Sequence, residues 1–123
     1  MSKKKTAVFG ASPNPQRYSY LATEMLQSYG HPVLPLGMRE GRIGEATIIT
    51  DWPDQIPDLD TVTLYVGPQH QPEHYDYLLN LKPKRFIFNP GTENPEFIQQ
   101  IQAAGMEAVT ACTLVMLRTD QYA

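Results

Sequence analysis

The sequence predicts an α/β fold in which a doubly wound parallel sheet lies between two layers of helices. Short apolar segments alternate with stretches of helical periodicity, a pattern typical of strands joined by crossover helices. Glycine follows most of the apolar segments and marks where the chain turns. The length of 123 residues is near the commonest size of one domain, so we expect a single domain over residues 1–123.

The first half of the chain predicts a strand, a helix and a second strand. Thr6–Phe9 is an apolar run that ends at Gly10. Tyr18–Tyr29 carries apolar residues at helical spacing and is followed by Gly30, so it predicts a helix with Tyr29 in the core. Val33–Leu36 predicts the second strand and Ala46–Ile49 a minor one.

The second half predicts three further strands separated by helices. The expected strands are Thr61–Val66, Arg85–Phe88 and Glu107–Ala111. The expected helices are Pro72–Leu81 and Pro95–Ala104, the latter closed by Gly105. The last apolar run, Leu114–Leu117, fits either type of element.

Composition and charge exclude several classes of protein. Hydrophobic residues make up 41% of the chain and charged residues 19%, which is typical of a globular protein and not of a disordered one. Ten basic against thirteen acidic residues give a net charge of −3, so we expect no nucleic-acid partner. Since no apolar stretch could form a signal peptide or span a membrane, we expect no membrane partner. The single cysteine favours the reducing cytoplasm.

Candidate ligand-binding residues follow the expected strands. Ligands of such sheets bind outside the carboxyl ends of the strands, and glycine lets the backbone approach them closely. The segments at these ends are Gly10-Ala11-Ser12, Gly37-Met38-Arg39, Gly67-Pro68-Gln69, Asn89-Pro90-Gly91 and Cys112. We therefore expect a small, nucleotide-like ligand at this edge.

The loop from Gly10 to Ser19 has the features of an anion-binding site. It lacks the G-x-G-x-x-G spacing of dinucleotide-binding loops. Backbone N–H groups at the start of the next helix favour an anion, and Arg17 with the hydroxyls of Ser12 and Ser19 could bind diphosphate oxygens. The alternative is that Ser19 only caps the helix and that Arg17 is a solvated surface charge.

Gly10-Ala11-Ser12, followed by Arg17 and Ser19, resembles the opening motif of the CoA-binding domain family. This Rossmann-like family includes small stand-alone bacterial proteins and the nucleotide-binding domain of the succinyl-CoA synthetase alpha subunit. The resemblance runs from Lys5 to about Tyr122. It includes the segments Gly30–Leu36, Ile43–Glu45, Asn89–Asn94 and Cys112–Leu117.

The resemblance implies that coenzyme A or an acyl-CoA lies across the carboxyl edge of the sheet. Ser12 and Arg17 would hold the diphosphate, and the loop Leu36–Arg39 would pass the ribose and its 3′-phosphate. The adenine would be flanked by Val66, Gly67, Pro68 and Gln69, and the pantetheine arm would face Asn89, Pro90, Gly91 and Cys112. The chain departs from the family where Leu36-Gly37 replaces an Asn-Pro, where Val66–Gln69 lacks an arginine, and where Thr110-Ala111 precedes Cys112 in place of Asp-Arg.

One feature independent of the family concerns the choice of nucleotide. A classical NAD site has an acidic residue at the end of the second strand, whereas this chain has Arg39 near that point. An arginine there suits an extra ribose phosphate, as in CoA or NADP, better than it suits NAD; of the two ligands, NADP is the less favoured.

Three functions are compatible with these residues. No set of nucleophile, base and orienting residue is evident, which favours a non-catalytic binding or sensor module. The alternatives are an NAD(P)-binding enzyme or enzyme subunit, and a regulatory or structural protein whose nucleotide site has degenerated. A homodimer formed through the last apolar run is also open.

Two further residue patterns have a simpler interpretation. His70-Gln71-Pro72-Glu73-His74 matches the H-x-x-E-H zinc signature, but Pro72 places both histidines around a helix start and we expect no metal. Cys112 is expected to be a small buried residue; the alternative is a thiol that forms a mixed disulfide with CoA.

Overall fold

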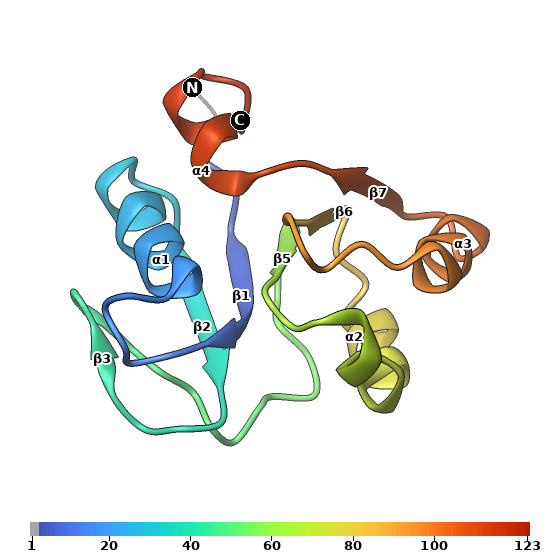
Figure 1. The fold of residues 1–123 in the computed structure, drawn as a ribbon, viewed down its shortest axis with the longest axis horizontal. Coiled ribbons are helices and arrows are strands. Elements are labelled where there is room, and N and C mark those ends of the chain that lie inside the picture. Colours follow the sequence, from blue (N-terminus) through green and yellow to red (C-terminus); the bar gives the residue numbers. More distant parts are fainter. Residues whose placement is uncertain (1–2) are drawn as a thin grey trace.

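The computed structural model describes residues 3–123 and contains a five-stranded sheet in the order β2-β1-β5-β6-β7 (Figure 1). The strands are β1 (Thr6–Ala11), β2 (Val33–Gly37), β5 (Thr61–Leu64), β6 (Arg85–Phe88) and β7 (Glu107–Thr110). All neighbouring strands pair in parallel. The predicted doubly wound α/β fold is confirmed, while positions 1 and 2 of the expected domain lie outside the described residues.

Helices cover both faces of the sheet. They are α1 (Tyr18–Ser28), α2 (Tyr75–Leu81), α3 (Pro95–Ala103) and α4 (Thr113–Arg118). Helices α1 and α4 lie on one face, and α2 and α3 lie on the other (Figure 1). The chain leaves β1 for β2 on one side and later returns to β5 on its other side, so the strand order reverses beside β1. No helix within residues 3–123 has the length and apolar character that a membrane span needs.

Strand β1 contributes side chains to both hydrophobic cores, because successive side chains of a strand point to opposite faces. Ala7 and Phe9 join the core beneath α2 and α3, whereas Val8 joins the core beneath α1 and α4. Ala11 also joins this second core, because the register of β1 against β2 shifts between Phe9 and Ala11 and interrupts the alternation. Ala7, Val8 and Phe9 are at most 1% exposed. This continuous burial explains why the segment is apolar at every position and does not alternate with polar residues.

The first helix is one residue shorter than predicted, and the prediction that Tyr29 lies in the core was wrong. Tyr29 follows the last residue of α1 and its side chain is 43% exposed. Gly30 then turns the chain with a φ of 82°, and His31, which is only 6% exposed, enters the interior instead.

Other boundaries also differ from the sequence prediction. The expected helix Pro72–Leu81 begins with 3-10 turns at Pro68–His70 and Pro72–His74, each with proline at its start, and becomes α2 at Tyr75. The minor strand at Ala46–Ile49 is β4 (Ala46–Thr47), which pairs with β3 (Arg42–Ile43) in a two-stranded ribbon. The last apolar run forms α4.

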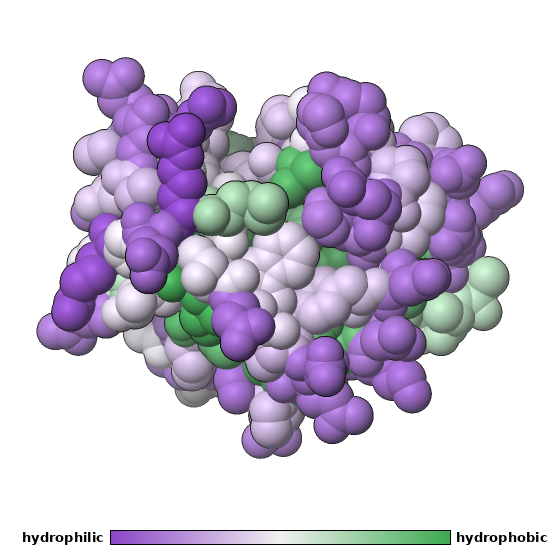
Figure 2. Space-filling view, turned by 90° about the horizontal axis from the view of Figure 1, so that it is seen from below, coloured by the Kyte–Doolittle hydropathy of each residue, from purple (hydrophilic) through white to green (hydrophobic). Residues whose placement is uncertain are grey.

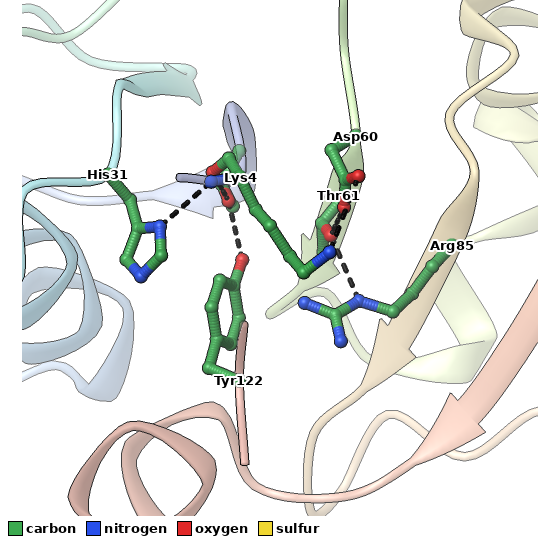
Figure 3. A network of polar contacts seen from close by, with 7 residues as sticks. Lys4, His31, Asp60, Thr61, Arg85 and Tyr122 are labelled. Carbon is green, nitrogen blue, oxygen red and sulfur yellow. Dashed lines mark hydrogen bonds and ion pairs between the residues drawn. The ribbon is translucent and has the colours of Figure 1, made fainter. Parts of the chain in front are cut away.

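A polar network closes the amino edge of the sheet, opposite the carboxyl ends of the strands (Figure 3). Tyr122 is 2% exposed, and its hydroxyl shares a hydrogen bond with Thr6 Oγ1. The Arg85 guanidinium lies 4.5 Å from the centre of the Tyr122 ring, and Arg85 Nε donates to Thr61 Oγ1 at 2.9 Å. The network thus fastens the end of the described chain to the starts of β1, β5 and β6.

His31 belongs to the same network and is held in its neutral form. Its Nδ1 accepts a hydrogen bond from the Lys4 backbone N–H at 2.9 Å, so that nitrogen carries no proton in this arrangement. Burial lowers the pKa of His31 below its usual value of 6.5, and the positive charges of Lys3, Lys4 and Arg85 lower it further. Asp60 opposes this shift.

We predict that His31 makes folding stability fall in mild acid. Because its folded pKa is lowered, the unfolded chain binds the proton more readily, so stability falls as the pH drops below about 6.5 and through the lower folded pKa. His31→Asn keeps an acceptor near the Nδ1 position but does not titrate. Urea unfolding at pH 7.5 and pH 5.0 should show a smaller pH-dependent loss for His31→Asn than for the wild type; an equal loss in both proteins would contradict the prediction.

Candidate functional site

The connection from β1 to α1 crosses the carboxyl edge at the point where the strand order reverses. Gly10 has a φ of 98°, and a Cβ added there would lie 2.9 Å from Val66 Cγ2 and 3.1 Å from the Tyr65 carbonyl. Beyond it, Ser12 Oγ accepts from the Asn14 N–H at 3.1 Å and leaves its own hydroxyl hydrogen free to donate. The start of the connection is therefore pressed against the segment that follows β5.

The amino end of α1 carries N–H groups without a side-chain cap. Arg17 is the N-cap residue and makes no side-chain capping bond, and the first turn has no acidic residue. The alternative in which Ser19 caps the helix is therefore wrong: Ser19 lies inside α1 and is 4% exposed. Uncapped N–H groups and the positive end of the helix dipole favour an anion at this position.

A cleft of about 730 Å³ opens at this edge. Figure 2 looks onto the edge from below the view of Figure 1 and shows a paler, partly apolar centre surrounded by strongly polar residues. The sequence-predicted residues that line the cleft lie at the carboxyl ends of β1 and β2, at the start of α1, and in the connections after β1, β2, β5 and β6. They are Gly10, Ala11, Ser12, Arg17, Ser19, Leu36, Gly37, Arg39, Val66, Gly67, Pro90 and Gly91. Arg17 and Arg39 are exposed, so each guanidinium is free to turn toward an anion.

The loop after β2 forms a second boundary of the cleft and sits very close to β1. A Cβ on Gly37 would lie 2.5 Å from the Ala11 carbonyl oxygen and 2.9 Å from Ile48 Cγ2. Trp52 Nε1 donates to the Gly37 carbonyl oxygen at 3.0 Å and holds this loop from the other side. Met38 projects beyond it and is 82% exposed.

Sequence reasoning missed an aromatic group in the cleft. Phe9, Trp52 and His74 all line it, with the Phe9 and Trp52 ring centres 5.0 Å apart and those of Trp52 and His74 5.4 Å apart. The sequence places His74 around a helix start, and in the structure its side chain is only 21% exposed. The signal available was the single tryptophan of the chain, which lies in an otherwise polar and proline-rich connection.

Tyr65 also lines the cleft, just beyond the end of β5. Burial raises the pKa of its phenol well above the usual 10, although hydrogen bonds with the Thr113 and Thr63 hydroxyls oppose the shift. The phenol therefore stays protonated at neutral pH.

Four sequence-predicted residues do not line the cleft: Pro68, Gln69, Asn89 and Cys112. Pro68 and Gln69 lie in the 3-10 turn that follows Gly67. Cys112 is partly buried and is the N-cap of α4.

Asn89 is 2% exposed and uses its side chain within the protein. Its Nδ2 donates to Thr63 Oγ1 and the Leu64 carbonyl oxygen at 2.6 and 2.9 Å, and its Oδ1 accepts from the Thr113 N–H at 2.9 Å. The amide thus joins the ends of β5 and β6 to the start of α4 and does not face the cleft.

The H-x-x-E-H pattern does not form a cluster of ligands. His70 and His74 fall in separate 3-10 turns, and only His74 reaches the cleft. Across residues 3–123, no group of three or more His, Cys, Asp or Glu side chains is arranged to hold a metal ion.

Comparison with known families gives one match. The profile of a family described as "CoA binding domain" matches residues 4–118. No curated protein matches the chain.

Several solved structures share the fold. A crystal structure of an uncharacterised protein superposes with a TM-score of 0.95 at 48% sequence identity, over 99% of this chain and 100% of that one. A Thermus thermophilus protein has a TM-score of 0.85 and 23% identity, over 98% of this chain and 91% of its own. A hypothetical protein from Pyrococcus horikoshii has a TM-score of 0.82 and 25% identity, over 95% of this chain and 83% of its own.

We predict that Gly37→Ala destabilises the fold by about 1–3 kcal/mol, because the new methyl group would meet the Ala11 carbonyl oxygen within the sheet. Gly67→Ala is the matched control. Its Cβ would meet only the movable end of the Gln69 side chain, so it should cost less than about 0.5 kcal/mol. Urea unfolding of both variants measures the difference, and equal stabilities would show that Gly37 is not constrained by this approach.

Proposed function

This chain belongs to the CoA-binding domain family, and on that premise we propose that it binds coenzyme A or an acyl-CoA across the carboxyl edge of its sheet. The observation that carries the proposal is the cleft at the point where the strand order reverses. The uncapped start of α1 and two exposed arginines, Arg17 and Arg39, line this cleft. A polyphosphate with an adenosine fits this combination of an anion site with a partly apolar centre.

Each part of the ligand has a matching part of the cleft. The diphosphate lies on the connection from Ser12 to Ser19, with Arg17 as its cation. The 3′-phosphate of the ribose lies near Arg39 in the loop after β2. The adenine packs against Val66 and Gly67, and the pantetheine arm leaves past Pro90 and Gly91. The residues that form this path all line the cleft.

We further propose that the domain acts as a binding or sensor module and performs no reaction itself. The titratable side chains lining the cleft are Arg17, Tyr18, Arg39, Tyr65 and His74. The Tyr65 phenol stays protonated at neutral pH, since burial raises its pKa. His74 Nε2 lies 3.8 Å from Glu73 Oε1, and the cleft hydroxyls of Ser12 and Thr92 make their hydrogen bonds with Asn14 and Asn89. His74 is therefore not hydrogen-bonded to either hydroxyl in the way that nucleophilic catalysis needs. A protein of this kind with one free thiol, Cys112, suits the cytoplasm.

The competing ligand is NADP, which also carries an extra ribose phosphate. The first residues after β2 are Met38 and Arg39, and neither supplies the carboxylate that accepts the ribose 2′-hydroxyl in NAD sites. Arg39 accordingly disfavours NAD but does not separate CoA from NADP. Titration of the protein with CoA and with NADP distinguishes these two ligands.

We predict that Arg17→Ala weakens CoA binding at least tenfold. A hydrogen bond to a charged group contributes about 1.5–3 kcal/mol, which corresponds to roughly a tenfold or larger change in affinity. Arg42→Ala is the matched control, because Arg42 is exposed on β3 and does not line the cleft. Calorimetric titration of the reduced protein measures both. Absence of heat with the folded wild type at millimolar CoA would refute the proposal and leave a degenerate site, whereas tighter binding of NADP would replace CoA as the ligand.

We predict that Arg39→Ala reduces the affinity for CoA to about that for dephospho-CoA, which lacks the 3′-phosphate. The variant should bind dephospho-CoA as the wild type does, because Arg39 contacts only the phosphate that is missing. Calorimetric titration of the wild type and of Arg39→Ala, each with CoA and with dephospho-CoA, gives the four affinities to be compared. An equal loss for both ligands would place Arg39 away from the 3′-phosphate.

A further inference from the structure

A buried amide, Gln71, joins the two loops that form one wall of the cleft. Val66 and Thr92 belong to these loops, which follow β5 and β6, and both residues line the cleft. Gln71 lies between the two 3-10 turns and is 0% exposed. Its Nε2 donates to the Val66 carbonyl oxygen at 2.9 Å and to the Thr92 carbonyl oxygen at 2.8 Å.

The sheet itself cannot hold these loops together. The paired segments of β5 and β6 end at Leu64 and Phe88. Two residues further along is Pro90, which has no N–H group to continue a ladder of hydrogen bonds. Asn89 fastens the loops at their base through the Leu64 carbonyl oxygen, and Gln71 fastens them farther out.

The orientation of the Gln71 amide is itself determined by its neighbours. Gln71 Oε1 accepts from Asn94 Nδ2 at 2.9 Å, and Asn94 also donates to the Tyr75 hydroxyl at 2.8 Å. Asn94 Oδ1 caps α3 by accepting from the Phe97 N–H, and the Tyr75 hydroxyl donates to Glu96. Both hydrogens of the Gln71 amide therefore point at the two loop carbonyls, and a rotated amide would leave buried groups unpaired.

We propose that Gln71 is a positioning residue that sets the separation of the Val66–Gly67 and Pro90–Thr92 loops and thereby the shape of this wall of the cleft. Its consequence for affinity rests on the proposed function, because the adenine and the pantetheine arm of CoA lie along these loops. Without the amide, the Val66 and Thr92 carbonyls need water as a partner, so the loops separate to admit it.

Gln71→Met tests the proposal, since methionine has a similar length but cannot donate. Hydrogen exchange of the Gly67, Gly91 and Thr92 amides reports the loops without any ligand, and calorimetric titration with CoA reports the site. We expect at least tenfold faster exchange at these amides and at least tenfold weaker CoA binding. Ile101→Ala is the control: Ile101 is 0% exposed in α3 and does not line the cleft, so it lowers stability without these local effects.

The outcomes separate the two proposals. Unchanged loop exchange in Gln71→Met would overturn the positioning role, as would equal CoA affinity in the variant and a binding-competent wild type. If the wild type itself binds no CoA, the proposed function fails, and the exchange measurement alone decides the role of Gln71. Should Gln71→Met not fold, Gln71→Asn, which is one methylene shorter and cannot reach both carbonyls, provides the same exchange comparison.

Discussion

The close packing of β1 between β2 and β5 is the constraint on which the rest of the structure depends. β1 is buried on both faces and paired along both edges. The part of this segment that can line a cleft is therefore the end of the strand, where the chain leaves the sheet. Gly10 and Gly37 mark where neighbouring backbones approach too closely for a side chain. The strand order reverses at the same point, and diverging connections open the cleft there. Core packing and the position of the site thus have one cause.

The walls of the cleft differ in how firmly they are held. Arg17 at the start of α1 and Arg39 in the loop after β2 are exposed, which suits charges that would bind a polyphosphate in the proposed function. The opposite wall is held by the buried amides of Gln71 and Asn89, whose hydrogen bonds are internal. A rigid wall lowers the cost of ordering the site when a ligand binds, while exposed cations supply attraction over a longer range. In the proposed function, affinity and shape would therefore depend on different residues.

The amino edge of the sheet has a separate task. Tyr122 and His31 pack with their ring centres 4.9 Å apart and join the end of the described chain to the start of β1. This cluster lies at the amino edge (Figure 3), and none of its labelled residues lines the cleft at the carboxyl edge, so we expect protonation of His31 to act on stability and not on the cleft. Measurements of binding in mild acid can consequently be corrected for unfolding with the His31→Asn variant.

Periodicity and turn residues were enough to identify every strand of the main sheet and the crossover helices, because these depend on local patterns of apolar residues and glycines. They also indicated the edge of the sheet at which the cleft lies. The motif around Ser12 and Arg17 also indicated which family to expect, and the family model matches residues 4–118. Which side chains face the cleft depended on contacts between distant segments. Asn89 follows a strand as a ligand-binding residue would, yet its amide is taken up by Leu64 and Thr113. Trp52 and His74 reach the cleft from connections whose paths no local pattern predicts, because their positions follow from packing against Phe9 and from the Gly37 carbonyl.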